Sequence, residues 1–304
     1  MIEQSHETAA PAHTEAHAPL APTDTTAAAP TTFTTRGAIP APAPAPATTA
    51  PPPPQASASD RAYGAADPTA TKVPLERVID GVTVLAPPGA HATAIDQCAS
   101  FIHAELGRNQ LAQKKLAEAR ATIVIIPAHT SMTDVEQFAS LRGKKTFDSR
   151  DWSSVRGSGG IKAPDGSFAI GVAEENLISV RGVVSSYPLG YSIGMHELAH
   201  GLQSHGMSAA QQQRLQELYK AHAAKDPGDT HDTFTEKYGA SNVQEYFAQG
   251  TNAFFGKNAR TGHNDRGWIQ QHDPDLYAFL VEMYETDFDR EGHHPGADAH
   301  HVAS

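Results

Sequence analysis

The sequence predicts a single α+β domain over residues 72–290, preceded by a long arm and followed by a short tail. Three observations support this prediction. Most of the prolines fall in the arm, short apolar runs typical of strands share the middle of the chain with apolar residues at helical spacing, and one predicted helix carries a His-Glu-x-x-His motif. By length alone, 304 residues could form two domains, but the composition of the arm makes one domain the better count.

The arm, residues 1–71, is predicted to be disordered and partly in the polyproline II conformation. It holds thirteen of the 22 prolines but only two aromatic residues, Phe33 and Tyr63, and it has no apolar periodicity that could offset the entropy lost on ordering. The tail, residues 291–304, is rich in histidine and is expected to be flexible, with at most weak metal binding.

Charge and hydropathy exclude several classes of partner. The net charge is −11 with histidines neutral, and no basic cluster is longer than a pair of lysines, so we expect no binding to nucleic acid or to an anionic membrane. No run approaches the roughly 20 apolar residues of a transmembrane segment. The first residues lack the basic start and apolar core of a classical signal peptide, and the single cysteine, Cys98, excludes an internal disulfide.

Turn signals and periodicity predict the elements in the first half of the domain. Asp80-Gly81 is a turn signal inside a hairpin over Leu75–Leu85. The apolar run Ile123–Ile126 is typical of a central strand, and a short helix is expected over 133–141. Between the hairpin and this strand, a helix is predicted from apolar residues spaced by three and four, which are Ile95, Cys98, Ile102 and Leu106.

Two further segments precede the motif. The glycines at 157–160 are expected to form a close backbone turn within a loop, and Ser167–Ala173 is predicted to be a strand.

The His-Glu-x-x-His motif consists of His196, Glu197 and His200 on a helix that begins after Pro188 and ends near residue 206. Residues four apart on a helix lie about 40° apart around its axis, so both imidazoles can face one metal ion. Glu197 lies about 100° further round, where a carboxylate can take a proton from metal-bound water. The alternative is an ordinary surface helix, which a third ligand would exclude.

A third ligand is predicted on a later helix. Ser241 or Asn242 can cap a helix that places Glu245 in its first or second turn. An inward acid beside Tyr246 and Phe247 would be costly to bury unpaired, and metal coordination compensates for that cost. The alternative is a solvated helix acid. Two other helices are predicted from their caps: one starts at Ser208 with Gln211 as its capping-box partner, and one starts at Asp273-Pro274.

These residues resemble the zinc metallopeptidases whose catalytic domain is like that of anthrax lethal factor, a domain that Pro-Pro endopeptidases share. The resemblance rests on the sequence His-Glu-Leu-Ala-His, on Tyr238-Gly239 seven residues before Glu245, and on the sequence Glu-Tyr-Phe-Ala that follows. It covers about residues 130–285, is weaker over 73–130 and is absent from the arm. It implies a zincin-like fold with a small mixed sheet, an active-site helix and a C-terminal helical subdomain.

The resemblance also implies a role for each residue. His196, His200 and Glu245 would bind one Zn²⁺ per chain, and Glu197 would be the general base of a zinc-dependent endopeptidase. Tyr238 would donate a hydrogen bond to the oxyanion, the alternative being a loop tyrosine packed on the core. Gln249 stands where relatives often carry an acid that orients a zinc-bound histidine, so ligand orientation would be kept with reduced basicity.

Substrate and location are less constrained. Zinc peptidases commonly hold substrate as an added strand at a sheet edge, and Ser167–Ala173 is the best-placed candidate; a purely structural strand is the alternative. The resemblance makes a protein or peptide substrate with proline plausible, and favours a toxin-like or effector-like protease that is secreted or translocated by a non-classical route over a cytoplasmic enzyme. A rival hypothesis is a catalytically weak, zinc-bound binding module whose proline-rich arm, including Pro51–Pro54, recruits partners.

Overall fold

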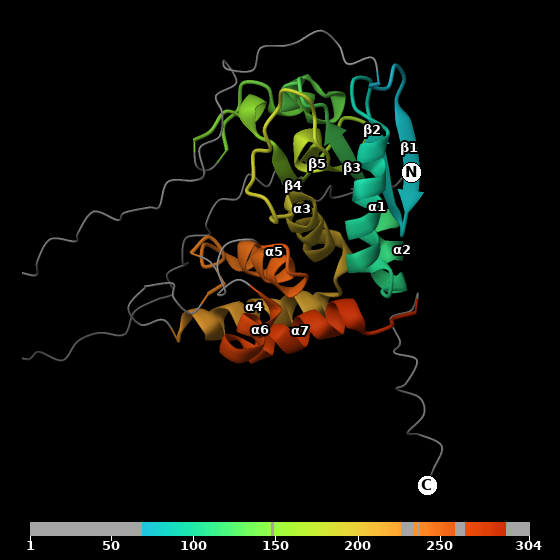
Figure 1. Ribbon diagram of the computed structural model, residues 1–304. Coiled ribbons are helices and arrows are strands. Elements are labelled where there is room, and N and C mark those ends of the chain that lie inside the picture. The colour runs from blue at the N-terminus through green and yellow to red at the C-terminus, as the bar shows by residue number, and fades with distance from the viewer. Residues whose placement is uncertain (1–68, 147–148, 226–233, 236, 259–264, 290–304) are drawn as a thin grey trace, which may run out of the picture.

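The computed structural model describes residues 69–146, 149–225, 234–235, 237–258 and 265–289. The predictions for the arm up to residue 68 and for the tail lie outside these residues. Figure 1 shows the sheet with helices α1 to α3 in the upper part of the molecule and helices α4 to α7 gathered below it. The fold is therefore of the mixed α+β class, as predicted.

One five-stranded sheet has the order β1-β2-β3-β5-β4. Its strands are β1 (Leu75–Ile79), β2 (Val82–Ala86), β3 (Ala121–Ile126), β4 (Gly157–Lys162) and β5 (Phe168–Ala173). Strands β2, β3 and β5 are parallel, whereas β1 and β4 run antiparallel to their neighbours at the two edges. The sheet is mixed, and its parallel centre is covered on both faces, as parallel sheets usually are.

The predicted hairpin is confirmed. Asp80 and Gly81 both have positive φ, 44° and 82°, which is the signature of a two-residue type I′ turn. The twist of that turn matches the right-handed twist of the flanking strands, so β1 pairs with β2 from Leu75 opposite Ala86 to Ile79 opposite Val82.

Each face of the sheet carries its own apolar core. Ile123 and Ile125 of β3 pack into the larger core with helices α1 (Thr93–Leu106), α2 (Gln110–Glu118) and α3 (Ile193–Gly201). Val124 and Ile126 point to the opposite face, as alternate residues of a strand must, and meet short 3₁₀ segments there. Those segments are Met132–Asp134, Glu136–Leu141 and Trp152–Ser154.

The helices below the sheet are α4 (Ala209–Ala223), α5 (Val243–Phe254), α6 (Arg266–His272) and α7 (Pro274–Glu285). The two predicted caps are confirmed. Ser208 and Gln211 form a reciprocal capping box at the start of α4, and the Asp273 side chain accepts from the backbone amide of Leu276 at the start of α7.

The prediction of a turn at 157–160 is wrong, because these glycines belong to strand β4. The strand has an irregular register between Ser158 and Ile161, and Gly160 has a positive φ of 125°. A glycine-rich segment has a low strand propensity, but it can pair with a sheet where the register is irregular in this way. The 133–141 segment is helical, but it forms 3₁₀ turns instead of an α-helix.

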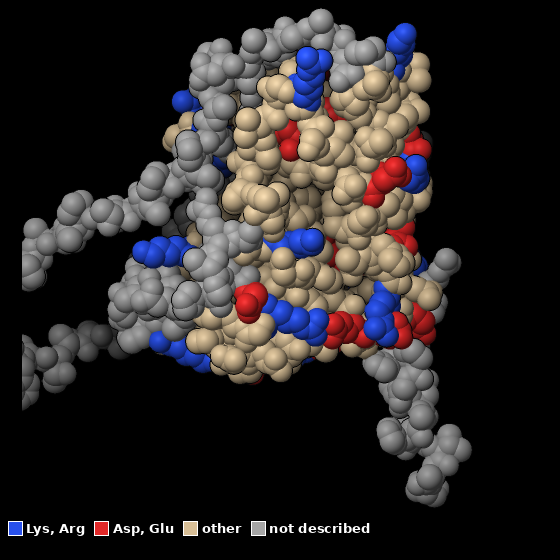
Figure 2. Space-filling view, in the orientation of Figure 1, with Lys and Arg blue, Asp and Glu red and all other residues tan. Residues whose placement is uncertain are grey.

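The described surface shows no extended field of one charge on the side seen in Figure 2, where acidic and basic side chains are intermixed. Exposed ion pairs such as Arg108–Asp287 and Arg266–Glu285 illustrate this mixing. Within the described ranges, no helix is both long and apolar enough to cross a membrane.

Candidate metal centre

Helix α3 presents the two histidines of the motif on one buried face. Its N-cap is Ser192, whose hydroxyl accepts from the backbone amide of Met195 at 3.3 Å, and every residue of the helix is buried. The four-residue spacing places the Nε2 atoms of His196 and His200 only 3.1 Å apart. Together with Glu197, the two histidines form a buried group that could hold a metal ion.

Helix α5 brings Glu245 to the same point. Its N-cap is Asn242, whose side-chain oxygen accepts from the Glu245 amide at 2.9 Å and fixes this residue in the first helical turn. The carboxylate oxygen Oε2 lies 3.1 Å from Nε2 of His196 and 3.6 Å from Nε2 of His200. Glu245 is only 1% exposed, so this acid does face inward, as its apolar neighbours in the sequence suggested.

The three atoms fit the donor set of a zinc ion. Donors at the corners of a tetrahedron with bonds of about 2.1 Å lie about 3.4 Å from one another, which is close to the three separations given above. Oε2 of Glu245 is buried without a hydrogen-bond partner among the described residues, which fits an oxygen that binds a metal ion. Imidazole nitrogens and a carboxylate oxygen are also the ligands that zinc prefers.

The two carboxyl groups of the centre differ in their pKa. Burial raises the pKa of Glu197 to about 8, an effect that His200 opposes and the negative charge of Glu245 reinforces. Burial would also raise the pKa of Glu245, but the adjacent His200 and His196 together hold it well below its usual range. A pair of acids with separated pKa values is typical of sites that move protons.

Tyr238, which precedes helix α5, contacts the centre. Its hydroxyl donates to Oε1 of Glu245 at 3.1 Å, and its ring lies 6.3 Å from that of His196. Burial of the hydroxyl and the nearby Glu245 charge raise the tyrosine pKa, so the phenol stays protonated and remains a hydrogen-bond donor. The residue as a whole is 41% exposed, so the hydroxyl is buried at the centre while other parts of the side chain reach the surface.

The structure thus brings together all five residues singled out in the sequence: His196, Glu197, His200, Tyr238 and Glu245. Their individual roles remain predictions. The amide nitrogen of Gln249 lies 3.5 Å from the hydroxyl of Tyr191. Tyr191 in turn contacts Nδ1 of His196 at 3.1 Å, and sequence reasoning missed this tyrosine because nothing in its local pattern distinguishes it.

Strand β4 forms the wall of the centre opposite α5, and its glycines are required by close packing. A Cβ atom at Gly157 would lie 2.7 Å from Oε1 of Glu197, and one at Gly159 would lie 2.7 Å from Cβ of His200. Real Cβ atoms are essentially never found this close to another heavy atom. The alternation of glycine at 157 and 159 was the available sequence signal, since alternate residues of a strand share one face.

The expectation that Ser167–Ala173 is the sheet edge beside the centre is wrong. The segment does form a strand, β5, but it lies between β3 and β4, with partners on both sides. The edge strand next to helix α3 is β4, because the chain adds this antiparallel strand outside the parallel centre of the sheet.

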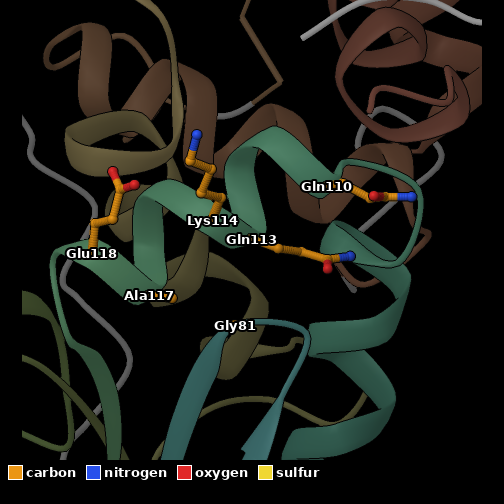
Figure 3. A pocket seen from close by; sticks show the side chains of 6 residues that line it. All are labelled: Gly81, Gln110, Gln113, Lys114, Ala117 and Glu118. Carbon is orange, nitrogen blue, oxygen red and sulfur yellow. The ribbon is translucent and has the colours of Figure 1, made fainter. Parts of the chain in front are cut away.

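A hollow of about 470 Å³ lies between helix α2 and the turn at Gly81. Figure 3 shows its lining: helix α2 passes beside the turn at Gly81, with the Gln113 side chain near the turn and those of Lys114 and Glu118 extending away from it. None of the residues of the metal centre lines it, so this hollow is separate from the candidate site.

Comparison with known proteins gives a distant structural likeness. No protein-family model matches the chain, and no curated protein matches it either. The Pro-Pro endopeptidase PPEP-2 from Paenibacillus alvei aligns with 66% of this chain and 97% of its own, with 15% sequence identity and a TM-score of 0.44. At this identity and TM-score the likeness does not assign a function, so the function is inferred from the residues of the centre.

Proposed function

We propose that this chain is a zinc-dependent endopeptidase that hydrolyses peptide bonds and binds one Zn²⁺. The observation that supports it is the convergence of Nε2 of His196, Nε2 of His200 and Oε2 of Glu245 within 3.1 to 3.6 Å of one another. These three residues would hold the ion. Three protein ligands leave a fourth position open, which is the arrangement of catalytic and not of structural zinc sites.

The chain's own groups supply the proton transfers. When bound, zinc supplies a Lewis acid that polarises the scissile carbonyl and acidifies a water molecule. Glu197 is placed beside the donor atoms, where the charge of a bound cation would lower its raised pKa, so that its carboxylate would take the proton of the attacking water and then pass it to the leaving amine. The Tyr238 hydroxyl would turn from Oε1 of Glu245 to donate a hydrogen bond to the oxyanion, a contribution of about 3 kcal/mol in a site that excludes water.

The free edge of β4 suggests how a substrate is held. A strand at a sheet edge has unpaired backbone groups, and an extended peptide can add to it with its scissile bond beside α3. The glycines at 157 and 159 leave this edge close to Glu197 and His200. The sequence resemblance favours a protein or peptide substrate with a proline-containing site. It also favours an enzyme that acts outside its own cell.

The test is cleavage of a mixed peptide library by zinc-loaded protein, read by mass spectrometry, beside the variant Glu197→Gln. We expect cuts by the parent and a loss of about 10³-fold in the variant, because the general base is removed while the shape of the side chain is kept. Glu217→Gln, which changes an exposed acid on α4, is the matched control and should cut as the parent does.

Two results would contradict the proposal. Equal cleavage by the parent and by Glu197→Gln would exclude the assigned base. Binding of one zinc ion without any cleavage would favour the rival hypothesis, a zinc-bound binding module, for which the neutral side chain of Gln249 is the supporting observation.

A further inference from the structure

Tyr191 makes a contact with the outer nitrogen of His196. The tyrosine ends the turn before α3, where its backbone amide donates to the carbonyl of Pro188 at 3.1 Å. Its ring stacks on Tyr187 at a centroid distance of 5.4 Å and an interplanar angle of 14°, which fixes the direction of the phenol. The hydroxyl lies 3.1 Å from Nδ1 of His196, on the side of the imidazole away from the other two donors.

The direction of this hydrogen bond follows from the donor set. Nε2 of His196 faces Oε2 of Glu245 and Nε2 of His200, so this nitrogen must keep its lone pair free to bind a cation. A neutral imidazole then carries its proton on Nδ1, and that N–H donates to the Tyr191 oxygen. The contact therefore selects the tautomer in which Nε2 can act as a ligand.

Gln249 holds the tyrosine from the other side. It lies one helical turn after Glu245 on α5, is 2% exposed, and places Nε2 of its amide 3.5 Å from the Tyr191 hydroxyl, at the long limit of a hydrogen bond. Its amide oxygen is buried without a hydrogen-bond partner among the described residues. Turning the amide by 180° exchanges oxygen and nitrogen, and the oxygen would then accept from the tyrosine hydroxyl.

We propose that Tyr191, supported by Gln249, is the positioning residue that fixes the orientation and tautomer of His196 as a zinc ligand. This inference rests on the proposed function, since it assigns a task to residues around the same centre. Buried ligand histidines need a partner on their second nitrogen, and here a neutral tyrosine and glutamine fill that place without adding negative charge. With the Gln249 amide turned in this way, the hydrogen bonds on the outer side of His196 would run from Nδ1–H to the tyrosine oxygen and from the tyrosine hydroxyl to the Gln249 oxygen.

The test measures zinc affinity by competition with a chromogenic chelator, so it does not depend on activity. We expect Tyr191→Phe to bind zinc about 10- to 100-fold more weakly than the parent, the usual cost of losing an outer hydrogen bond to a ligand. Tyr277→Phe on α7 is the matched control, because it removes a tyrosine hydroxyl that accepts from Arg266, and it should stay within about twofold of the parent. Gln249→Leu should weaken binding less than Tyr191→Phe, and combining the two should add little, because Gln249 acts through the tyrosine.

Two controls separate positioning from a general structural role. The urea unfolding midpoint of zinc-free Tyr191→Phe should match that of the zinc-free parent. In the zinc-loaded parent, the Nδ1–H proton of His196 should give an NMR signal that exchanges slowly with water, and this exchange should become faster in the variant.

The possible failures can be distinguished. Parent-like zinc affinity and parent-like proton exchange in Tyr191→Phe would overturn the positioning role and leave the proposed function intact. A lower unfolding midpoint of the zinc-free variant that accounts for the whole affinity loss would do the same. A parent that binds no zinc would overturn the proposed function itself, and this inference with it.

Discussion

Replacing the two glycines of β4 by alanine separates the parts of the candidate centre. The added Cβ at Gly157 would lie 2.7 Å from Oε1 of Glu197 and 2.6 Å from Cγ1 of Ile193; that at Gly159 would lie 2.7 Å from Cβ of His200. Ordinary carbon contacts begin near 3.5 Å, so each neighbour must move by about 0.8 Å. Neither glycine has a positive φ, so the effect comes from the added methyl group and not from backbone strain.

The two substitutions should affect different measurements. We expect Gly157→Ala to lower kcat by about 100-fold, because a displacement of this size misplaces the base, while zinc affinity stays close to that of the parent. Gly159→Ala meets the rigid base of the His200 side chain, so it should weaken zinc binding by at least about tenfold and lower the free energy of unfolding by about 1 to 3 kcal/mol.

The assays are chelator competition, steady-state cleavage of a library-derived peptide, and urea unfolding with and without zinc. Gly267→Ala on α6 is the matched control, because its added Cβ comes no closer than 3.4 Å to Asp265 and alanine favours a helix. If Gly157→Ala and Gly159→Ala behave like this control, β4 does not pack against the centre as described. If both glycine variants lose stability but keep the zinc affinity and kcat of the parent, strand β4 has only a structural role and does not position Glu197 or His200.

Two predictions concern stability away from the centre. Glu105 is buried with neither carboxyl oxygen hydrogen-bonded to a described residue, and burial holds its pKa well above the usual value. Its carboxyl therefore stays protonated in the folded state while it ionises in the unfolded state, and the free energy of unfolding falls as the pH rises above about 5. Glu105→Gln should match the parent near pH 4 and gain up to about 1.4 kcal/mol per pH unit above pH 5, measured by urea unfolding; a pH-independent difference would refute this. Arg156 and Glu175 form a fully buried ion pair with contacts of 2.6 and 2.7 Å, so Arg156→Met should cost about 3 to 5 kcal/mol and Arg156→Met/Glu175→Leu should recover much of it. A double variant as unstable as the single one would show that the loss is not due to an unpaired charge.

The features that could be predicted from the sequence are those that depend on the geometry of a single helix or turn. The spacing of His196 and His200 is a property of one helix, and the caps at Ser208 and Asp273 depend on residues within one turn, so these features could be predicted from short segments. The position of Glu245 needed more than its own helix. Its inward direction was expected from its apolar neighbours and from a family resemblance, and the structure shows it beside both histidines.

The features that sequence reasoning missed depend on contacts between distant segments. The sequence predicts a loop where strand β4 lies, because glycine has low strand propensity. The glycines of β4 are needed, however, because this strand passes helix α3 at close range. Tyr191 contacts a side chain five residues later across a helix start, a geometry without a spacing rule. Helix α2 was not predicted because only Ala112 and Leu116 are buried on it, too few for a clear periodic stripe.

The donor atoms of the centre come from two different halves of the domain. His196 and His200 belong to the helix that lies on the sheet, whereas Glu245 belongs to the helical group below it (Figure 1). Under the proposed function, the ion links these two halves. Because only the native chain binds the ion, its binding free energy adds to the free energy of unfolding. At a free zinc concentration 100 times the dissociation constant, this linkage is worth about 2.7 kcal/mol. The lifetime of the folded chain would then follow the zinc supply of its surroundings, so that a compartment poor in zinc would limit how long the protein persists as well as how fast it works.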